Sequence, residues 1–221
     1  MPLKVTAMSV VDELTPEAKE IGSINTIIVR RGADGKPTLV GQNFDWEGVR
    51  ESIRGSLDAG RRGLEEPFGK EMSGFIIGES LRLLRSGEKR AEEHYCAGGG
   101  GTTRAAVFAL SRLGLSPIFL INRDPSETKS IVDHFPQYDL RALDSVEDWT
   151  KECEDSVAAG VGAIPSFEPV TEGEVNVYRI ASKIFAGEVA DGRRRTFLEM
   201  CYKPRVTVRL ILHLQVPSQV P

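Results

Sequence analysis

The chain has 221 residues, of which 40% are hydrophobic and 27% are charged, as in an ordinary soluble globular protein. Its 28 lysines and arginines are outnumbered by 32 aspartates and glutamates, which gives a formal net charge of −4. This balance offers no electrostatic reason to expect a nucleic-acid partner. No apolar run approaches the roughly 18 residues of a membrane-spanning helix. Function must therefore be sought in the motifs.

The start of the chain and its cysteines indicate a reducing, cytoplasmic environment. MPLKVTAMSVVDEL lacks the apolar core of about 7–15 residues that a secretory signal needs. The three cysteines and three histidines lie far apart in the sequence: Cys96, Cys153, Cys201, His94, His134 and His213. Because this spacing suits neither a disulfide framework nor a zinc site, we predict no metal.

The first third of the chain predicts a helix, a β-hairpin and a second helix. Thr15 followed by Pro16 is typical of a helix N-cap and first helical residue. The run INTIIV at 24–29 is β-branched, and a turn separates it from 38–40, so we expect a hairpin. A further helix is expected over 45–57.

A polar stretch and an apolar one follow. Residues 58–70 contain three glycines and a proline among charged residues, which indicates an exposed excursion. Residues 74–84 (GFIIGESLRLL) have apolar residues at helical spacing, so we predict a helix there. The composition of the sequence changes around residues 86–88, and we place the boundary between two structural units near residue 87.

The second half alternates strands and helices around a glycine loop. We expect a strand at 94–97, the loop at 98–101, a helix to Gly114, a strand at 118–121, a helix to Phe135 and a strand at 157–164. This order predicts a parallel βαβ unit in a Rossmann-like α/β domain.

The glycine loop indicates a phosphate site. Glycines allow a tight turn and a close approach of the backbone, and the helix that follows offers free N–H groups to a pyrophosphate. Arg123 follows the next strand, where an arginine favours a 2′-phosphate, so it argues for NADP over NAD. Against this, Glu92 and Glu93 stand directly before His94 in the segment AEEHYCA that enters the loop, where apolar residues are expected. The alternative is a nucleotide-type fold without a ligand.

Lys4, Asn25 and Asp45 are candidate site residues in the first unit. They occur in PLK, GSINT and GQNFDWEG, among glycines and turn residues. A lysine and an aspartate from such segments can meet in a cleft between two units. The alternative is that they are solvated surface residues.

Five strings together resemble the shikimate dehydrogenase family, including its quinate dehydrogenase relatives. They are DELTPEAKEIGSINTI, GQNFDWEG, GGGGTTRAA, INRD and LEMCYKPRVT, and they occur in the family's order over residues 1–208. The KPRVT form is most similar to fungal members, in which such a domain ends the pentafunctional aromatic-pathway polypeptide and a related quinate repressor.

The resemblance implies reversible NADP-dependent oxidation of shikimate to 3-dehydroshikimate, a step toward aromatic amino acids. It implies that Lys4 is catalytic, that Asp45 is catalytic and binds substrate, and that Asn25 and Tyr202 bind substrate. The implied cofactor-binding residues are Gly98, Gly100, Gly101, Thr102, Asn122, Arg123 and Met200. The cofactor carries the hydride, while the protein orients the substrate and transfers the proton.

The resemblance also implies a division of the chain. Residues 1–86 would form a partial substrate-binding α/β domain, residues 87–205 a Rossmann-like NADP-binding domain, and residues 206–221 a divergent tail. Compared with the family, the chain is expected to be truncated at both ends and to derive from a larger polypeptide.

Two residues depart from the family pattern. Phe44 replaces a threonine that contacts substrate, and Glu127 replaces a basic residue near the 2′-phosphate. Two alternatives to the enzyme therefore stay open: a non-catalytic shikimate- or quinate-sensing regulatory domain, and an inactive fragment. Whether shikimate or quinate is the preferred small-molecule ligand also stays open.

Overall fold

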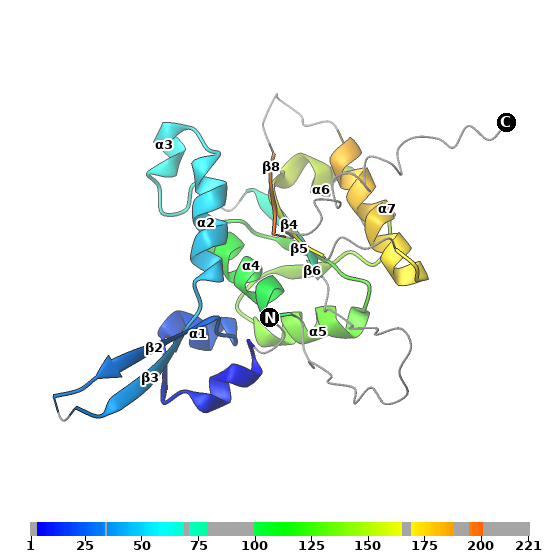
Figure 1. Cartoon of the computed structure of the whole chain (residues 1–221). Coiled ribbons are helices and arrows are strands. Elements are labelled where there is room, and N and C mark those ends of the chain that lie inside the picture. The colour runs from blue at the N-terminus through cyan, green and yellow to red at the C-terminus, as the bar shows by residue number, and fades with distance from the viewer. Residues whose placement is uncertain are drawn as a thin grey trace, which may run out of the picture.

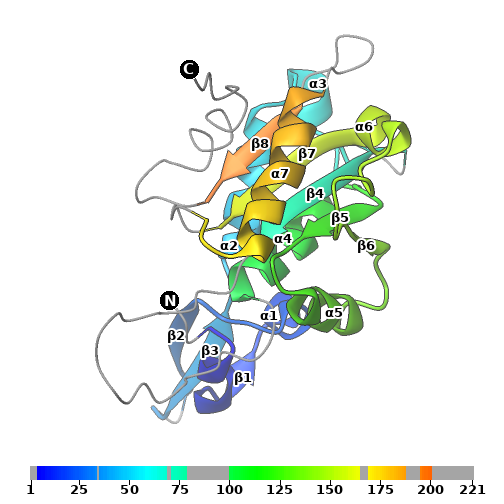
Figure 2. The ribbon, with the colours of Figure 1, turned by 90° about the vertical axis from the view of Figure 1, so that its right-hand side faces the viewer.

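The chain folds around two β-sheets, seen from two sides in Figures 1 and 2. The computed structural model describes residues 4–33, 35–68, 71–78, 100–164, 169–187 and 195–200. The smaller sheet has three strands in the order β1-β3-β2, and the larger has five in the order β6-β5-β4-β7-β8. This mixture of helices with a parallel sheet confirms the predicted α/β class.

The N-terminal part contains the small sheet and its neighbouring helices. Its elements are η1 (Thr6–Val10), β1 (Glu13–Leu14), α1 (Pro16–Ile21), β2 (Thr26–Arg31), β3 (Pro37–Gln42), α2 (Asp45–Gly55) and α3 (Ala59–Arg62). The predicted hairpin is confirmed, because β2 and β3 pair antiparallel with Ile28 opposite Val40. The predicted N-cap is confirmed too, since the Thr15 hydroxyl accepts a hydrogen bond from the Ala18 amide at 3.2 Å.

The large sheet and its helices form the rest of the described chain. Their elements are β4 (Ser73–Gly78), α4 (Gly101–Arg112), β5 (Ile118–Ile121), α5 (Pro125–His134), β6 (Leu140–Ala142), α6 (Lys151–Ser156), β7 (Val157–Ala163), α7 (Glu172–Ala186) and β8 (Thr196–Glu199). All neighbouring strands in this sheet are parallel. Numbered from β4, the strand order is 3-2-1-4-5, that of a Rossmann-like fold.

Both faces of the large sheet are buried under helices, as a parallel sheet requires. Side chains of β4 alternate between the faces: Ile76 belongs to one apolar cluster, and Phe75 and Ile77 belong to the other. The first cluster includes Trp46 of α2 and Phe108 of α4, whose rings pack edge to face with their centroids 5.0 Å apart. Figure 2 shows α7 crossing the opposite face. Through α2, the N-terminal part is packed against the core of the large unit.

One secondary-structure prediction is wrong. Residues 74–78 form most of β4, the central strand, although the sequence predicted a helix over 74–84. Every residue of β4 is buried, and a short apolar run of this kind cannot be distinguished from a buried helix by its spacing. Residues 79–84 lie outside the described residues, as do the strand expected at 94–97 and the acidic pair Glu92 and Glu93.

The position of β4 also bears on the division of the chain. A boundary near residue 87 assigns β4 to the first unit, yet β4 is hydrogen-bonded between β5 and β7 in the second. We therefore propose that the second unit begins at β4. The predicted strands at 118–121 and 157–164 are confirmed as β5 and β7, and the predicted helix ending near Phe135 is confirmed as α5. The tail at 206–221 lies outside the described residues.

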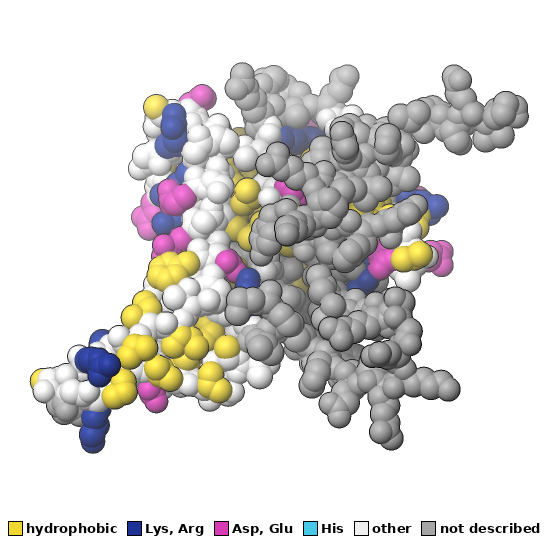
Figure 3. All heavy atoms as spheres, viewed as in Figure 1, with side chains coloured by type: hydrophobic (Ala, Val, Ile, Leu, Met, Phe, Trp, Pro, Cys, Tyr) yellow, Lys and Arg dark blue, Asp and Glu magenta, His cyan; other side chains and the backbone are white. Residues whose placement is uncertain are grey.

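The first strand of the hairpin is largely exposed. Ile27, Ile28 and Val29 of β2 are between 42% and 55% exposed. Figure 3 shows hydrophobic side chains at the surface along the hairpin. Within the described residues, no helix is long and apolar enough to cross a membrane.

Candidate functional site

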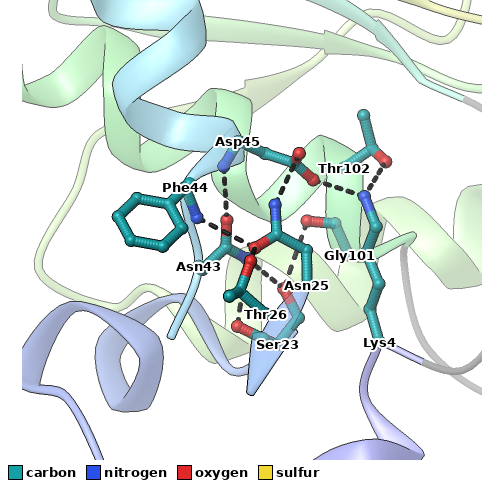
Figure 4. Close-up of polar contacts among 9 residues, drawn as sticks. All are labelled: Lys4, Ser23, Asn25, Thr26, Asn43, Phe44, Asp45, Gly101 and Thr102. Atoms are coloured by element: carbon teal, nitrogen blue, oxygen red, sulfur yellow. Dashed lines mark hydrogen bonds and ion pairs between the residues drawn. The ribbon is translucent and has the colours of Figure 1, made fainter. Parts of the chain in front are cut away.

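The candidate site lies where the N-terminal segments meet the first turn of α4 (Figure 4). Lys4 precedes η1, Asn25 precedes β2, and Asp45 is the first residue of α2. The Lys4 carbonyl accepts a hydrogen bond from the Ile24 amide at 2.9 Å, which holds the lysine segment beside the start of β2. Three residues that are distant in sequence are thereby brought together, as the motif analysis anticipated.

Lys4 is held by partners from both units. Its ammonium group forms an ion pair with the Asp45 carboxylate and donates a hydrogen bond to the Thr102 hydroxyl of α4 at 3.1 Å. The Lys4 and Asp45 side chains are 14% and 23% exposed, so the pair is mostly but not completely buried. An amine held in this way can give a proton to, or take one from, a bound hydroxyl or carbonyl group.

Asn25 orients the carboxylate of this pair. Its side-chain NH₂ donates to Asp45 Oδ1 at 2.8 Å, while its carbonyl oxygen accepts from the Phe44 amide and the Thr26 hydroxyl, both at 3.0 Å. These acceptor contacts hold the amide so that its NH₂ points at Asp45. The ring of Phe44 is turned away from Lys4 in Figure 4 and is 39% exposed, so it contributes its backbone to the network.

Two supporting residues were missed by the sequence analysis. Ser23 and Asn43 are fully buried polar residues. The Asn43 NH₂ donates to the backbone and side-chain oxygens of Ser23 at 3.0 Å, and the Asn43 carbonyl accepts from the Asp45 amide at 3.0 Å. The Ser23 hydroxyl donates to the Gly101 carbonyl at 3.3 Å. Ser23 occurs in the motif GSINT and Asn43 in GQNFD, and their place in these motifs is the sequence signal that could have identified them.

The start of α4 has the features of a phosphate-binding helix terminus. Gly100 is its N-cap and has no side chain to occupy the first amides. A Cβ on Gly101 would lie 3.0 Å from Ser23 and 3.1 Å from Lys4, so a larger residue here would require one of these neighbours to shift. A dinucleotide pyrophosphate fits this donor set of backbone amides beside the Thr102 hydroxyl. Gly98 lies outside the described residues.

Arg123 and Asn122 follow β5, at the same edge of the large sheet. Arg123 forms an ion pair with Glu174 of α7, and the Asn122 NH₂ donates to Glu127 Oε2 at 3.1 Å. Hydrogen bonds from the Thr171 and Val170 amides, together with Arg123, lower the pKa of Glu174 to about 2 despite its partial burial. Sequence analysis found Arg123 but not Glu174, which is 51 residues further along the chain.

The remaining predicted residues lie near the end of the described chain. Met200 follows β8, donates its amide to the Gly162 carbonyl at 2.8 Å and packs against the core cluster that includes Phe108. Tyr202 lies outside the described residues. Within the described ranges, no cluster of three or more histidine, cysteine, aspartate or glutamate side chains has the arrangement of a metal site.

Together, the fold and the site define an α/β protein with a Rossmann-like unit and a lysine–aspartate pair beside its first helix. No family model matches the chain. The chain is 34% identical over 210 residues to the pentafunctional AROM polypeptide of Scheffersomyces stipitis, and this match covers 94% of the chain and 11% of that polypeptide.

Solved structures agree with this similarity. The dehydroquinate dehydratase and shikimate dehydrogenase from S. pombe AroM is 31% identical with a TM-score of 0.64, and the match covers 96% of this chain and 34% of that one. The fold is also that of a shikimate 5-dehydrogenase from Thermus thermophilus in complex with NADP(H) and shikimate, with a TM-score of 0.55 at 20% identity over 96% of this chain and 62% of that one. In sequence and fold the chain therefore resembles the shikimate dehydrogenases, and it spans 11% of the AROM polypeptide and 34% of the S. pombe chain.

Proposed function

We propose that the chain is an NADP-dependent oxidoreductase that interconverts shikimate and 3-dehydroshikimate. The observation that carries this proposal is the Lys4–Asp45 pair held against the start of α4. The chain spans 11% of the length of the AROM polypeptide and 34% of the S. pombe chain. Quinate, a related polyol acid, is the second substrate to test.

The large unit supplies the groups that would hold the cofactor. The first amides of α4, beginning at Gly101, would bind a pyrophosphate at the positive end of the helix dipole, and Thr102 would add a hydroxyl. Arg123 and Asn122, after β5, would bind the 2′-phosphate and ribose of the adenosine end. Gly98 and Met200 complete the proposed cofactor contacts. When bound, the nicotinamide supplies or accepts the hydride.

Lys4 would transfer the proton. In the direction of ketone reduction, its ammonium group donates a proton to the oxygen as the carbon is reduced; in the direction of oxidation, the neutral amine takes the hydroxyl proton. The ion pair with Asp45 is the charge state needed for reduction. Thr102 keeps Lys4 beside the start of α4, where the two units meet.

Asp45 and Asn25 would bind the substrate hydroxyls, with Tyr202 from the C-terminal segment. Asp45 accepts from both Lys4 and Asn25, and a substrate hydroxyl would join this network at the same carboxylate. Asn25 donates one hydrogen bond to the carboxylate and is itself held by two that it accepts, so the substrate meets a site that is already organised.

The experiment that tests this proposal compares Lys4→Ala with the unaltered chain and with Lys129→Ala. Lys129 is a surface lysine, 74% exposed, that pairs with Asp133 on α5. NADPH formation is followed by absorbance with shikimate, and then with quinate, as substrate. Lys4→Ala should lower kcat by about 10²- to 10⁴-fold, while Lys129→Ala should leave it unchanged. Turnover that does not depend on Lys4 would contradict the proposal.

The two alternatives predict other results. A sensing domain would bind shikimate or quinate without turnover, and the similarity to the S. pombe dehydroquinate dehydratase and shikimate dehydrogenase does not favour it. An inactive fragment would lack a cooperative thermal unfolding transition. The same preparation therefore separates all three hypotheses.

A further inference from the structure

Arg123 is engaged by a carboxylate of its own chain. Its guanidinium group pairs with Glu174, and the two side chains are only 17% and 18% exposed. The start of α7 is packed tightly against the arginine, because a Cβ on Gly173 would lie 2.9 Å from the Arg123 carbonyl oxygen. The pair is thus built into the junction of β5 and α7 and differs from a loose surface contact.

Glu174 is held in place independently of Arg123. It is the third residue of α7, and its carboxylate accepts from the Val170 amide at 2.9 Å and the Thr171 amide at 3.0 Å. Thr171 returns the contact, since its hydroxyl accepts from the Glu174 amide at 3.2 Å. The pKa of about 2 means that Glu174 is ionised at neutral pH. Arg123 therefore faces a full negative charge that has a fixed position.

The pair borders a small hollow at the carboxyl ends of the central strands. The hollow is lined by Gly78 at the end of β4, Arg123 after β5, Ile164 after β7, and three residues of α7: Glu174, Val177 and Tyr178. In open α/β sheets, ligands bind at this edge, where the strand order reverses. A second carboxylate, Glu127, accepts a hydrogen bond from Asn122 beside Arg123.

We propose that Glu174 sets the preference of this chain between phosphorylated and unphosphorylated dinucleotides, an inference that rests on the proposed function. A 2′-phosphate must displace the Glu174 carboxylate from Arg123 or share the guanidinium with it, at a cost in repulsion between anions. A 2′-hydroxyl carries no charge and leaves the pair intact. Glu174 thus weakens the selection for NADP that Arg123 alone would provide.

The test compares dinucleotide binding by the unaltered chain, Glu174→Gln and Thr171→Ala. Glutamine keeps an oxygen that accepts from the Val170 and Thr171 amides but removes the charge. Thr171→Ala removes the capping hydroxyl and keeps the charge, so it is the matched control for changes in α7. Dissociation constants for NADPH and NADH are measured by nicotinamide fluorescence, and those for 2′,5′-ADP and AMP by calorimetry.

Glu174→Gln should tighten binding of NADPH and 2′,5′-ADP by roughly three- to tenfold and leave NADH and AMP unchanged. Thr171→Ala should leave the ratio of NADPH to NADH affinity as it is. If Glu174→Gln does not raise the ratio of NADPH affinity to NADH affinity, this inference is overturned while the proposed function stands. If the unaltered chain and both variants are folded but bind none of the four probes, the inference and the proposed function are both overturned.

Discussion

The two sheets are built from strands of similar composition, but their surroundings differ. β4 contains Phe75, Ile76 and Ile77, and all six of its residues are buried between helices. β2 contains Ile27, Ile28 and Val29, and its last five residues are exposed. The large sheet is therefore stabilised by burial on both faces. The small sheet gains much less from burial, so its stability depends more on its contacts with the large unit.

Besides the apolar packing of α2 on α4, polar contacts attach the small sheet to the large unit. The Glu20 carbonyl of α1 accepts from His134 Nε2 at 2.9 Å, and the Glu20 carboxylate accepts from the Tyr138 hydroxyl at 2.6 Å. Ser23 binds the Gly101 carbonyl, and Lys4 binds Thr102. The candidate site thus lies across a junction between a well-packed unit and a weakly packed one. Substitutions in the two regions should affect the molecule differently.

The largest expected effect is in the core of the large unit. Phe108→Ala removes a fully buried ring that packs edge to face on Trp46, so the free energy of unfolding should fall by about 3–5 kcal/mol. Val29→Ala on the 55% exposed hairpin should change it by less than about 0.5 kcal/mol. Urea denaturation followed by circular dichroism measures both. Equal losses of unfolding free energy in the two variants would contradict the contrast between the sheets.

The junction itself is tested by Gly22→Ala. Gly22 ends α1 with φ of +70°, and a Cβ there would lie 2.6 Å from His134 Cε1 and 2.8 Å from an Arg104 guanidinium nitrogen. Gly35 in the hairpin turn has φ of +74° and no atom within 4 Å of such a Cβ, so Gly35→Ala carries the backbone strain alone.

Gly22→Ala should destabilise the chain by about 1–3 kcal/mol and Gly35→Ala by about 1 kcal/mol, measured by the same denaturation. Gly22→Ala should also lower turnover with shikimate, because it moves the segment that carries Asn25 relative to α4. Identical effects of the two substitutions would show that the contact with His134 has no role in holding the units together.

The smallest effect concerns the pH dependence that Glu174 contributes. Its pKa is lowered from 4.5 to about 2 in the folded chain, so its contribution is complete above about pH 4.5 and is lost as the pH falls toward 2. The difference in unfolding free energy between the unaltered chain and Glu174→Gln should be on the order of 1 kcal/mol at pH 7 and shrink by pH 3. A difference that grows as the pH falls would contradict this assignment.

Local signals in the sequence predicted much of this structure. Thr15 with Pro16 started α1, the β-branched run at 24–29 gave the hairpin strand, and the glycine loop preceded α4. Each signal depends on residues that are close together in the chain. β4 was misread because its apolar run is compatible with either a buried helix or a buried strand until its neighbours β5 and β7 are known.

The site was predictable to the extent that motifs marked its residues. Lys4, Asn25 and Asp45 were found as candidates, and the structure brings their side chains together. The pairing of Arg123 with Glu174 was not found, because α7 carries no motif that points back to β5. Ser23 and Asn43 were passed over because their complete burial is a property of the packed units.

The central claim is that both units form one site, with the substrate bound by the small unit and the cofactor by the large one. A fluorescence titration with NADPH, in the presence and absence of shikimate, tests this claim most directly. We predict that shikimate tightens NADPH binding to the unaltered chain and that Asp45→Asn abolishes this coupling. A folded chain that binds NADPH with the same affinity whether or not shikimate is present would contradict the account.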